Sequence, residues 1–243
     1  TEVLLAAEKI AQNAGANLRL LLSGGLDSEV MARAFLEIGA KFQPVFIAYQ
    51  RSHLPDRFFA DQFCHQAGLK LEVVPLDENH FFAKEMFALA EEFHISEPFA
   101  CFDIKRLKLL DDYVVFGTGD LLLEYDQKTT GIHSYESSNL FAPIWYLQTV
   151  NRESCYHFYQ YTPELMSAFL NDKTIRTWIE LAPKLGFENV RYFKYHLYKK
   201  FWPEIEIRNK FYGYEAMITE YYTAEAKLKE LFSSDSHQLR IPV

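Results

Sequence analysis

The sequence predicts an α/β fold in which a doubly wound parallel sheet is followed by a mostly helical C-terminal part. In the first half, short apolar runs alternate with segments whose apolar residues recur at helical spacing, a pattern typical of a parallel sheet. From about Asn151 the pattern becomes helical and aromatic, and no glycine- or serine-rich linker separates the halves. We therefore expect an α/β domain over 1–150, with a helical, aromatic-rich part over 151–243 packed on it.

Four apolar runs in the first half are the expected strands. These runs are Leu18–Leu22, Gln43–Tyr49, Leu69–Pro75 and Tyr113–Phe116. The helices expected between them are Glu29–Ile38, Asp56–Ala67 and Phe81–Phe93. Before the first strand, TEVLLAAEKIAQNAG has the pattern of an amphipathic helix rather than a signal peptide, and in the second half TPELMSAFLNDKTIRTWIELA opens on a Thr-Pro helix start. Ligands of such sheets bind beyond the carboxyl ends of the strands, so we expect the site there.

Composition limits the classes of protein that remain. The 243 residues are 49% hydrophobic, which is enough for a large core and argues against disorder. A net charge of -8 disfavours a surface that grips nucleic acid throughout, and no apolar run is long enough to span a bilayer. We expect a soluble, cytoplasmic protein. Cys64, Cys101 and Cys155 are widely spaced, which favours ordinary reduced thiols over disulfides or a metal pair.

The stretch LRLLLSGGLDSEVMARAFL places two glycines and an aspartate between the first strand and the first helix of the sheet. A turn of this kind directs main-chain N–H groups and the positive end of a helix dipole towards an anion. The Walker A pattern and the GxGxxG fingerprint are both absent there. In this setting SGGLDS, residues 23–28, resembles the pyrophosphate loop of the N-type ATP pyrophosphatase superfamily, whose fold is called adenine nucleotide alpha hydrolase-like. Among its members, the synthetase domain of asparagine synthetase is the one the chain resembles most.

The resemblance implies that ATP and Mg²⁺ bind at this loop. In the family the glycines let the main chain approach the β and γ phosphates, the serines donate hydrogen bonds, and the aspartate, here Asp27, ligates magnesium. The end of the second strand would lie beside adenine. The residues that the resemblance implies in ATP binding are Ser23, Gly24, Gly25, Leu26, Asp27, Ser28, Ile47, Ala48, Tyr49, Gly117 and Arg208.

Two further stretches supply candidate catalytic residues. VVFGTGDLLLEY, residues 114–125, loosely resembles a glycine-rich acidic stretch of asparagine and β-lactam synthetases. This resemblance implies that Asp120 contacts magnesium or substrate, and it implies the same, on a weaker match, for Glu124. The order of the acids differs from the family pattern, and a simple strand-ending turn is the alternative. In FWPEIEIRNKFYGYE, Arg208 and Lys210 fall two apart. In the superfamily a lysine from the C-terminal part often contacts the pyrophosphate, and the resemblance implies this role for Lys210. The alternative is that Arg208 and Lys210 are a pair of solvated surface residues.

The function implied is an adenylating ligase that forms AMP and pyrophosphate. It would activate a carboxylate or carbonyl of a small molecule for attack by ammonia or an amine. A helix rather than a strand follows Thr1, and no glutaminase domain is recognised before the loop, so nitrogen would come from solution, a separate protein or the substrate. The basic, aromatic run VRYFKYHLYKKFW suggests a tRNA- or nucleobase-modifying enzyme instead, but Tyr195, Tyr198 and Trp202 recur at helical spacing and predict a buried face. An inactive nucleotide-binding protein is a further alternative.

Overall fold

A computed structural model describes residues 2–49, 54–118, 122–126, 131–135, 141–177, 181, 190–208 and 218–233. Its centre is a four-stranded sheet in the order β3-β2-β1-β4, with all neighbouring strands parallel. The strands are β1 (Leu18–Leu21), β2 (Gln43–Tyr49), β3 (Glu72–Leu76) and β4 (Tyr113–Phe116). The predicted α/β fold with a parallel sheet is confirmed.

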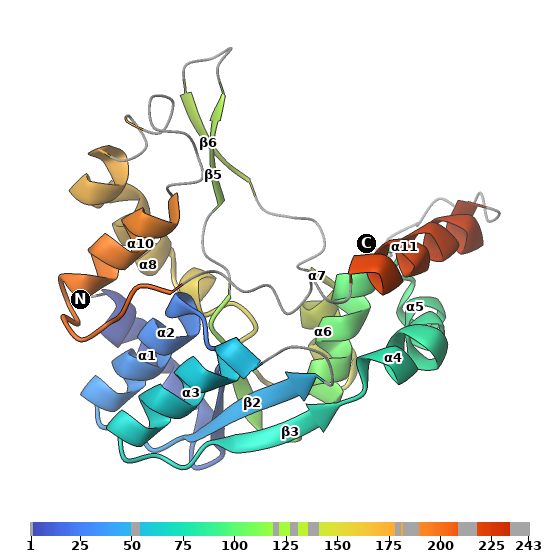
Figure 1. The fold of residues 1–243 in the computed structure, drawn as a ribbon, viewed down its shortest axis with the longest axis horizontal. Helices are drawn as coiled ribbons and strands as arrows, with labels where there is room; N and C mark the ends of the chain where they lie inside the picture. Colours follow the sequence, from blue (N-terminus) through green and yellow to red (C-terminus); the bar gives the residue numbers. More distant parts are fainter. Residues whose placement is uncertain are drawn as a thin grey trace.

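Helices connect the strands and make up most of what is described after Asn151 (Figure 1). Those of the first half are α1 (Glu2–Ala14), α2 (Leu26–Glu37), α3 (Leu54–Gln66), α4 (Glu78–His80), the π-helix η1 (Phe81–Glu85), α5 (Met86–Phe93), α6 (Pro98–Lys108) and α7 (Phe141–Thr149). Those of the second half are the 3-10 helix η3 (Phe158–Gln160), α8 (Pro163–Asn171), α10 (Val190–Lys199) and α11 (Ile218–Ser233). A separate antiparallel pair consists of β5 (Leu122–Asp126) and β6 (Gly131–Tyr135).

The sheet is covered by helices on both faces. Alternate strand residues such as Leu20 and Phe46 pack with α1, α2, α3, η3, α8 and α10 on one face. Their neighbours, such as Leu21 and Val45, pack with α5, α6, α7 and α11 on the other. In Figure 1, α1, α2, α3, α8 and α10 lie at the left of the view, and α5, α6, α7 and α11 lie at the right. Burial on both faces explains why the strands are nearly continuous apolar runs.

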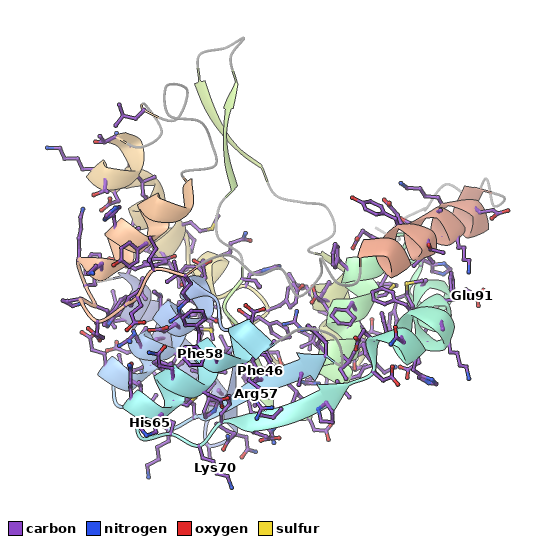
Figure 2. The ribbon with its side chains drawn as sticks, in the orientation of Figure 1. Phe46, Arg57, Phe58, His65, Lys70 and Glu91 are labelled. Atoms are coloured by element: carbon purple, nitrogen blue, oxygen red, sulfur yellow. The ribbon has the colours of Figure 1, made fainter. Side chains whose placement is uncertain are left out.

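Individual side chains show the same division between core and surface on α3. Phe46 of β2 is 1% exposed and belongs to the same apolar cluster as Ala60 and Phe63 of α3. The opposite side of α3 carries Arg57 and Phe58, both exposed (Figure 2). Helix α3 therefore has one face in the core and one in solvent, as its predicted amphipathic pattern requires.

The third strand begins three residues later than Leu69, where the sequence analysis placed its start. Gly68 has a φ of +67°, and the Leu69 N–H donates to Cys64 O at 2.8 Å. This bond closes the C-terminal turn of α3, so the Leu69 amide is used there before the strand can start.

Several features of the chain differ from the expected elements, among them β5, β6 and α7, which were not expected. The predicted helix Phe81–Phe93 contains a π-helical stretch, and α6, capped by Glu97 through a bond to Ala100 N–H at 2.7 Å, was not predicted. The sheet also continues beyond β4. Cys155 forms a parallel bridge to Val115, with N–H···O distances of 2.9 Å on both sides. The chain after Asn151 therefore adds to the sheet edge before it becomes helical.

The second half begins its helical course as the Thr-Pro signal indicates. Thr162 Oγ1 accepts the Leu165 N–H at 3.1 Å, and Pro163 is the first residue of α8. Helix α8 ends at Asn171, and Asp172 caps a new helical segment through bonds to the N–H groups of Thr174 and Ile175. The expected helix is therefore divided at Asp172.

Two other expectations concern the described part of the chain. Within it, every helix is too short or too polar to cross a membrane. Cys64, Cys101 and Cys155 are buried free thiols, and burial raises the pKa of the Cys64 and Cys101 thiols to about 12. These thiols are protonated at neutral pH and therefore behave as small apolar side chains.

Candidate phosphate-loop site

The loop Ser23–Ser28 joins the carboxyl end of β1 to the first turn of α2. Gly25 is the N-cap residue of α2 and makes no side-chain cap, and the first intrahelical bond runs from the Glu29 N–H to Gly25 O at 3.2 Å. The first turn, from Leu26 onward, therefore presents main-chain N–H groups that have no partner within the helix. Together with the helix dipole, these groups favour an anion beyond the carboxyl edge of the sheet.

Gly24 has a backbone that only glycine fits. Its φ is +77°, and a β-carbon built there would lie 2.0 Å from Asp56 O and 2.6 Å from Asp56 C. The start of α3 is thus packed directly against the α-carbon of Gly24. The sequence analysis assigned this glycine to close approach by phosphate; the structure adds a packing reason for it.

The two serines hold the loop in shape. Ser28 Oγ accepts the Ser23 N–H at 3.1 Å and donates to Gly25 O at 3.0 Å. The Gly25 N–H points to Ser23 Oγ at 3.3 Å, and the two hydroxyl oxygens are 3.1 Å apart. Because Ser28 is only 3% exposed, its hydroxyl serves the loop itself in this structure. Its hydrogen bond to phosphate stays a prediction, as does that of the exposed Ser23.

Arg208 reaches the loop from the second half of the sequence. Its Nη1 donates to Gly24 O at 2.6 Å, and its guanidinium forms an ion pair with Glu29 and lies 4.6 Å from the centre of the Phe59 ring. Burial lowers the pKa of Arg208 to about 10, so it remains charged at neutral pH. The prediction placed Arg208 in ATP binding, and the structure brings it to the loop.

Glu29 is shared between two arginines. Besides Arg208, its carboxylate pairs with Arg33 at 2.7 Å, and Arg33 also pairs with Glu204. The side chain of Glu29 is 5% exposed and that of Arg208 8% exposed. A buried carboxylate needs such compensation, since removing one partner leaves charge without a counter-ion. The network attaches the segment 204–208 to the first turns of α2.

The space between Arg208, the loop and α3 is small. The cavity measures about 10 Å³ and is lined by Leu22, Gly24, Gly25, Ser28, Glu29, Phe59, Ala60, Phe63 and Arg208. This is room for about one water molecule. A phosphate group that enters from this side therefore has to displace the guanidinium, whereas one on the outer side of the loop does not.

Two tyrosines from the second half contact Asp27. Tyr198 of α10 donates from its hydroxyl to Asp27 Oδ1 at 2.7 Å, and Tyr159 of η3 donates to the main-chain oxygen of Asp27 at 2.8 Å. Both rings are buried, and burial together with the nearby Asp27 raises the pKa of Tyr198 well above its ordinary value. Tyr198 is therefore a neutral hydrogen-bond donor to the carboxylate.

The ends of β4 and β2 lie at the same edge of the sheet as the loop. A β-carbon at Gly117 would lie 2.6 Å from Ser28 Cα, so β4 leads directly against the loop. At the end of β2, Ile47 is buried, and Ala48 and Tyr49 are partly exposed. The structure thus gathers the predicted residues of three strand ends at one edge, and their contacts with ATP stay predictions.

Several predicted residues lie outside the described part of the chain. These are Asp120, Lys210 and Thr1, and of Glu124 the structure describes the main chain in β5 but not the side chain. Among the described residues, no group of three or more His, Cys, Asp or Glu side chains is arranged to hold a metal ion. The predicted catalytic roles of Asp120 and Lys210 therefore stay predictions.

No protein-family model matches the chain, and none of the curated proteins matches it. Solved structures give a distant likeness in fold. The glutamine-dependent NAD⁺ synthetase of Acinetobacter baumannii in complex with ADP is 14% identical, with a TM-score of 0.34; the alignment covers 46% of this chain and 24% of the synthetase chain.

Two shorter proteins are similar over more of their length. The NH₃-dependent NAD synthetase of Campylobacter jejuni, in complex with nitrate, is 11% identical over 99% of this chain and 98% of its own, with a TM-score of 0.38. A predicted subunit of tRNA methyltransferase from Methanocaldococcus jannaschii is 16% identical over 63% of this chain and 73% of its own, also with a TM-score of 0.38. None of these three proteins is an asparagine synthetase, and the resemblance to that enzyme stays a prediction from the sequence.

The residues that surround Asp27 and Arg208 were not predicted from the sequence. Tyr198 was assigned to a buried helix face, which is confirmed, but a buried tyrosine hydroxyl usually needs a partner, and this need was the available signal. Tyr159 and Arg33 carried no comparable signal. Glu29 follows the loop directly, and its burial could not be predicted without knowing that Arg208 pairs with its carboxylate.

Proposed function

We propose that this chain binds ATP with its phosphates at the loop Ser23–Ser28 and uses it to adenylate a carboxylate or carbonyl of a small molecule. The observation that carries the proposal is the loop itself: a glycine with positive φ and the uncapped first turn of α2, both at the carboxyl edge of a parallel sheet. This position suits the phosphates of a nucleotide. The SGGLDS sequence supplies the assignment to ATP pyrophosphatases, by resemblance.

The residues at the loop fit a magnesium ion that is bound mainly through the nucleotide. Mg²⁺ typically keeps several waters and takes one or two carboxylates together with phosphate oxygens. Asp27, at the start of α2, provides one carboxylate, and a dedicated cage of protein ligands is not required. When bound, the ion neutralises charge on the phosphates. Asp120 is a second candidate ligand.

The proposed reaction divides the remaining work between protein groups. A substrate oxygen attacks the α phosphorus, the bond from that phosphorus to the bridging oxygen breaks, and pyrophosphate leaves with the electron pair. Ammonia or an amine then displaces AMP from the activated carbon. The N–H groups of the first turn of α2 bind the leaving phosphates. Lys210 adds positive charge, which is worth most where charge grows during the reaction, and Arg208 adds it once its pair with Glu29 is released.

The first prediction tests this reaction through its products. Purified protein is incubated with MgATP and a panel of carboxylic acids and carbonyl compounds, with and without ammonia, and AMP and pyrophosphate are measured. We expect both products in equal amounts with at least one substrate. Asp27→Asn should lower the rate by about 10²-fold or more, because it removes the negative charge that attracts the ion, while asparagine still accepts the Tyr198 hydrogen bond.

A matched control for this variant is Asp61→Asn on α3. Asp61 is an exposed aspartate that pairs with Arg57 at 3.3 Å, and its loss should leave product formation unchanged. Formation of ADP and phosphate instead of AMP and pyrophosphate would contradict the proposed reaction. Tight MgATP binding without turnover across the panel would favour the inactive nucleotide-binding alternative.

A further inference from the structure

We propose that Tyr198 is a positioning residue that holds the Asp27 carboxylate in the orientation needed for the loop cation. The inference rests on the proposed function, because it concerns the same loop and the same ion. Tyr198 lies on α10, 171 residues beyond Asp27 in the sequence, so α10 takes part in the site.

The geometry gives Asp27 two anchors of different kinds. Tyr159 holds the main chain of the residue through its carbonyl oxygen at 2.8 Å, and Tyr198 holds the side chain through Oδ1 at 2.7 Å. The first bond fixes where the residue lies, and the second fixes the rotation of its carboxylate. Both donors are nearly immobile, since Tyr159 is 6% and Tyr198 5% exposed within the apolar cluster that includes α1 and α2.

A carboxylate held in this way can still serve a cation. Its two oxygens offer about four acceptor positions, of which the Tyr198 hydroxyl takes one. A neutral hydroxyl donor orients the group without replacing its charge, whereas an arginine or lysine in the same place would compete with the metal. Partners that orient a ligating carboxylate typically change metal affinity by about 10- to 100-fold when removed.

The tyrosine also explains how the second half contributes to the loop. Leu197 and Tyr198 of α10 are buried in the same cluster as Val30, Met31 and Ala34 of α2. The hydroxyl therefore projects from a packed helix–helix contact rather than from a loose segment. Its position is fixed by the fold, as a positioning role requires.

The test compares two tyrosines on one helix. Tyr198→Phe removes the hydroxyl that reaches Asp27, and Tyr195→Phe removes one that instead accepts a hydrogen bond from Lys199 Nζ at 2.7 Å on the surface. Binding of ATP and of ADP is measured by calorimetry over a series of Mg²⁺ concentrations. We expect Tyr198→Phe to raise the Mg²⁺ concentration for half-maximal nucleotide affinity by about 10-fold, with affinity at saturating Mg²⁺ nearly restored. Tyr195→Phe should match the wild type.

A double variant separates positioning from a general structural effect. In an Asp27→Asn background, Tyr198→Phe should cause little further change in the Mg²⁺ dependence, because the group that it orients no longer carries the charge. Should Tyr198→Phe fail to fold, Tyr159→Phe is measured in the same way and should shift the Mg²⁺ dependence in the same direction.

The outcomes distinguish this inference from the proposed function. If the wild type binds nucleotide with a clear Mg²⁺ dependence and Tyr198→Phe behaves like Tyr195→Phe, the positioning role is overturned and the proposed function stands. If the wild type binds no nucleotide at any Mg²⁺ concentration, the proposed function fails and the inference fails with it. A shift that is equally large in the Asp27→Asn background would also overturn the role of Tyr198.

Discussion

At Gly24 the backbone leaves no room for any side chain. Its positive φ alone makes other residues unfavourable, and Asp56 of α3 closes the space that a β-carbon would need. The two constraints are separable, because the chain contains other glycines with similar φ and open surroundings. Gly39, with a φ of +71°, has nothing within 4 Å of a built β-carbon.

The second prediction uses that contrast. Gly24→Ala should lower the free energy of unfolding by about 3 kcal/mol, since strain in φ adds to a main-chain clash. Gly39→Ala should cost only about 1 kcal/mol, the strain part alone. Urea unfolding followed by circular dichroism measures both. Equal losses would show that the contact with Asp56 contributes nothing.

Asp56 is a buried carboxylate beside the loop whose ionised form is disfavoured by burial. It lies in the first turn of α3, is 9% exposed, and burial raises the pKa of its carboxyl from an ordinary 3.8 to about 6. The folded protein therefore holds a proton there more tightly than the unfolded chain does. The stability gained in this way is complete below about pH 4 and is lost as the pH rises through about 6.

The third prediction follows from the raised pKa of Asp56 and the resulting loss of stability with rising pH. Asp56→Asn should be more stable than the wild type at pH 8, by about 1 kcal/mol after allowance for partial contact with water, and the difference should vanish near pH 4. Thermal unfolding across pH 4–8 measures it. Asp61→Asn, which removes an exposed carboxylate of the same helix, is the control. A difference that grows towards low pH would contradict the assignment.

The residues of the loop could be predicted from the sequence, and the family resemblance also implied Arg208, whereas the contacts that hold the loop could not be predicted. SGGLDS is a short, local signal whose strand and helix lie on either side of it. Tyr198 and Arg208 meet the loop because α10 and the segment after it fold back over α2, where Glu204 also pairs with Arg33. No spacing within the sequence encodes that contact, so it required the structure.

At the scale of elements, the limits of a strand or helix were predicted accurately where its own hydrophobic pattern determines them. The strands Gln43–Tyr49 and Tyr113–Phe116 were predicted with their observed limits, because both are apolar runs between polar ends. Helix α6 was missed although Glu97 and Pro98 form a good helix start, because its polar residues obscure the apolar face. The bridge at Cys155 is a single residue long and leaves no periodic pattern.

The fourth prediction concerns which elements respond to nucleotide. With MgATP, amide hydrogen exchange should slow most over residues 22–30 and 45–49, which hold the loop, the first turn of α2 and the end of β2. Bound phosphates would hold the N–H groups of the loop, and adenine would cover the strand end. Helix α5, on the other face of the sheet, serves as the internal reference. Protection confined to residues after 151 would contradict the site.

At the scale of the whole molecule, the sheet separates two groups of helices, and residues of one group contact the loop. Helices α2, α3 and α10, with η3, cover the face that leads to the loop, and they supply the residues that hold it. Helices α5, α6, α7 and α11 cover the other face. Among the described residues, Tyr159 of η3 and Tyr198 of α10 in the first group join the second half of the sequence to the loop. The doubly wound pattern predicted both covered faces, but not this division of roles.

The contacts of Asp27 and Gly24 also imply that the site is completed late during synthesis of the chain, after most of the sequence has been translated. Tyr159, Tyr198 and Arg208 are 132, 171 and 184 residues beyond their partners in the loop. At a ribosomal rate of about 5–20 residues per second, the loop waits roughly 7–37 s for them. During that interval β1 and α2 can form and Arg33 can pair with Glu29, but Asp27 lacks both tyrosines and Glu29 lacks its second arginine, Arg208. We expect nucleotide affinity to arise with the docking of α10 rather than with the formation of the loop.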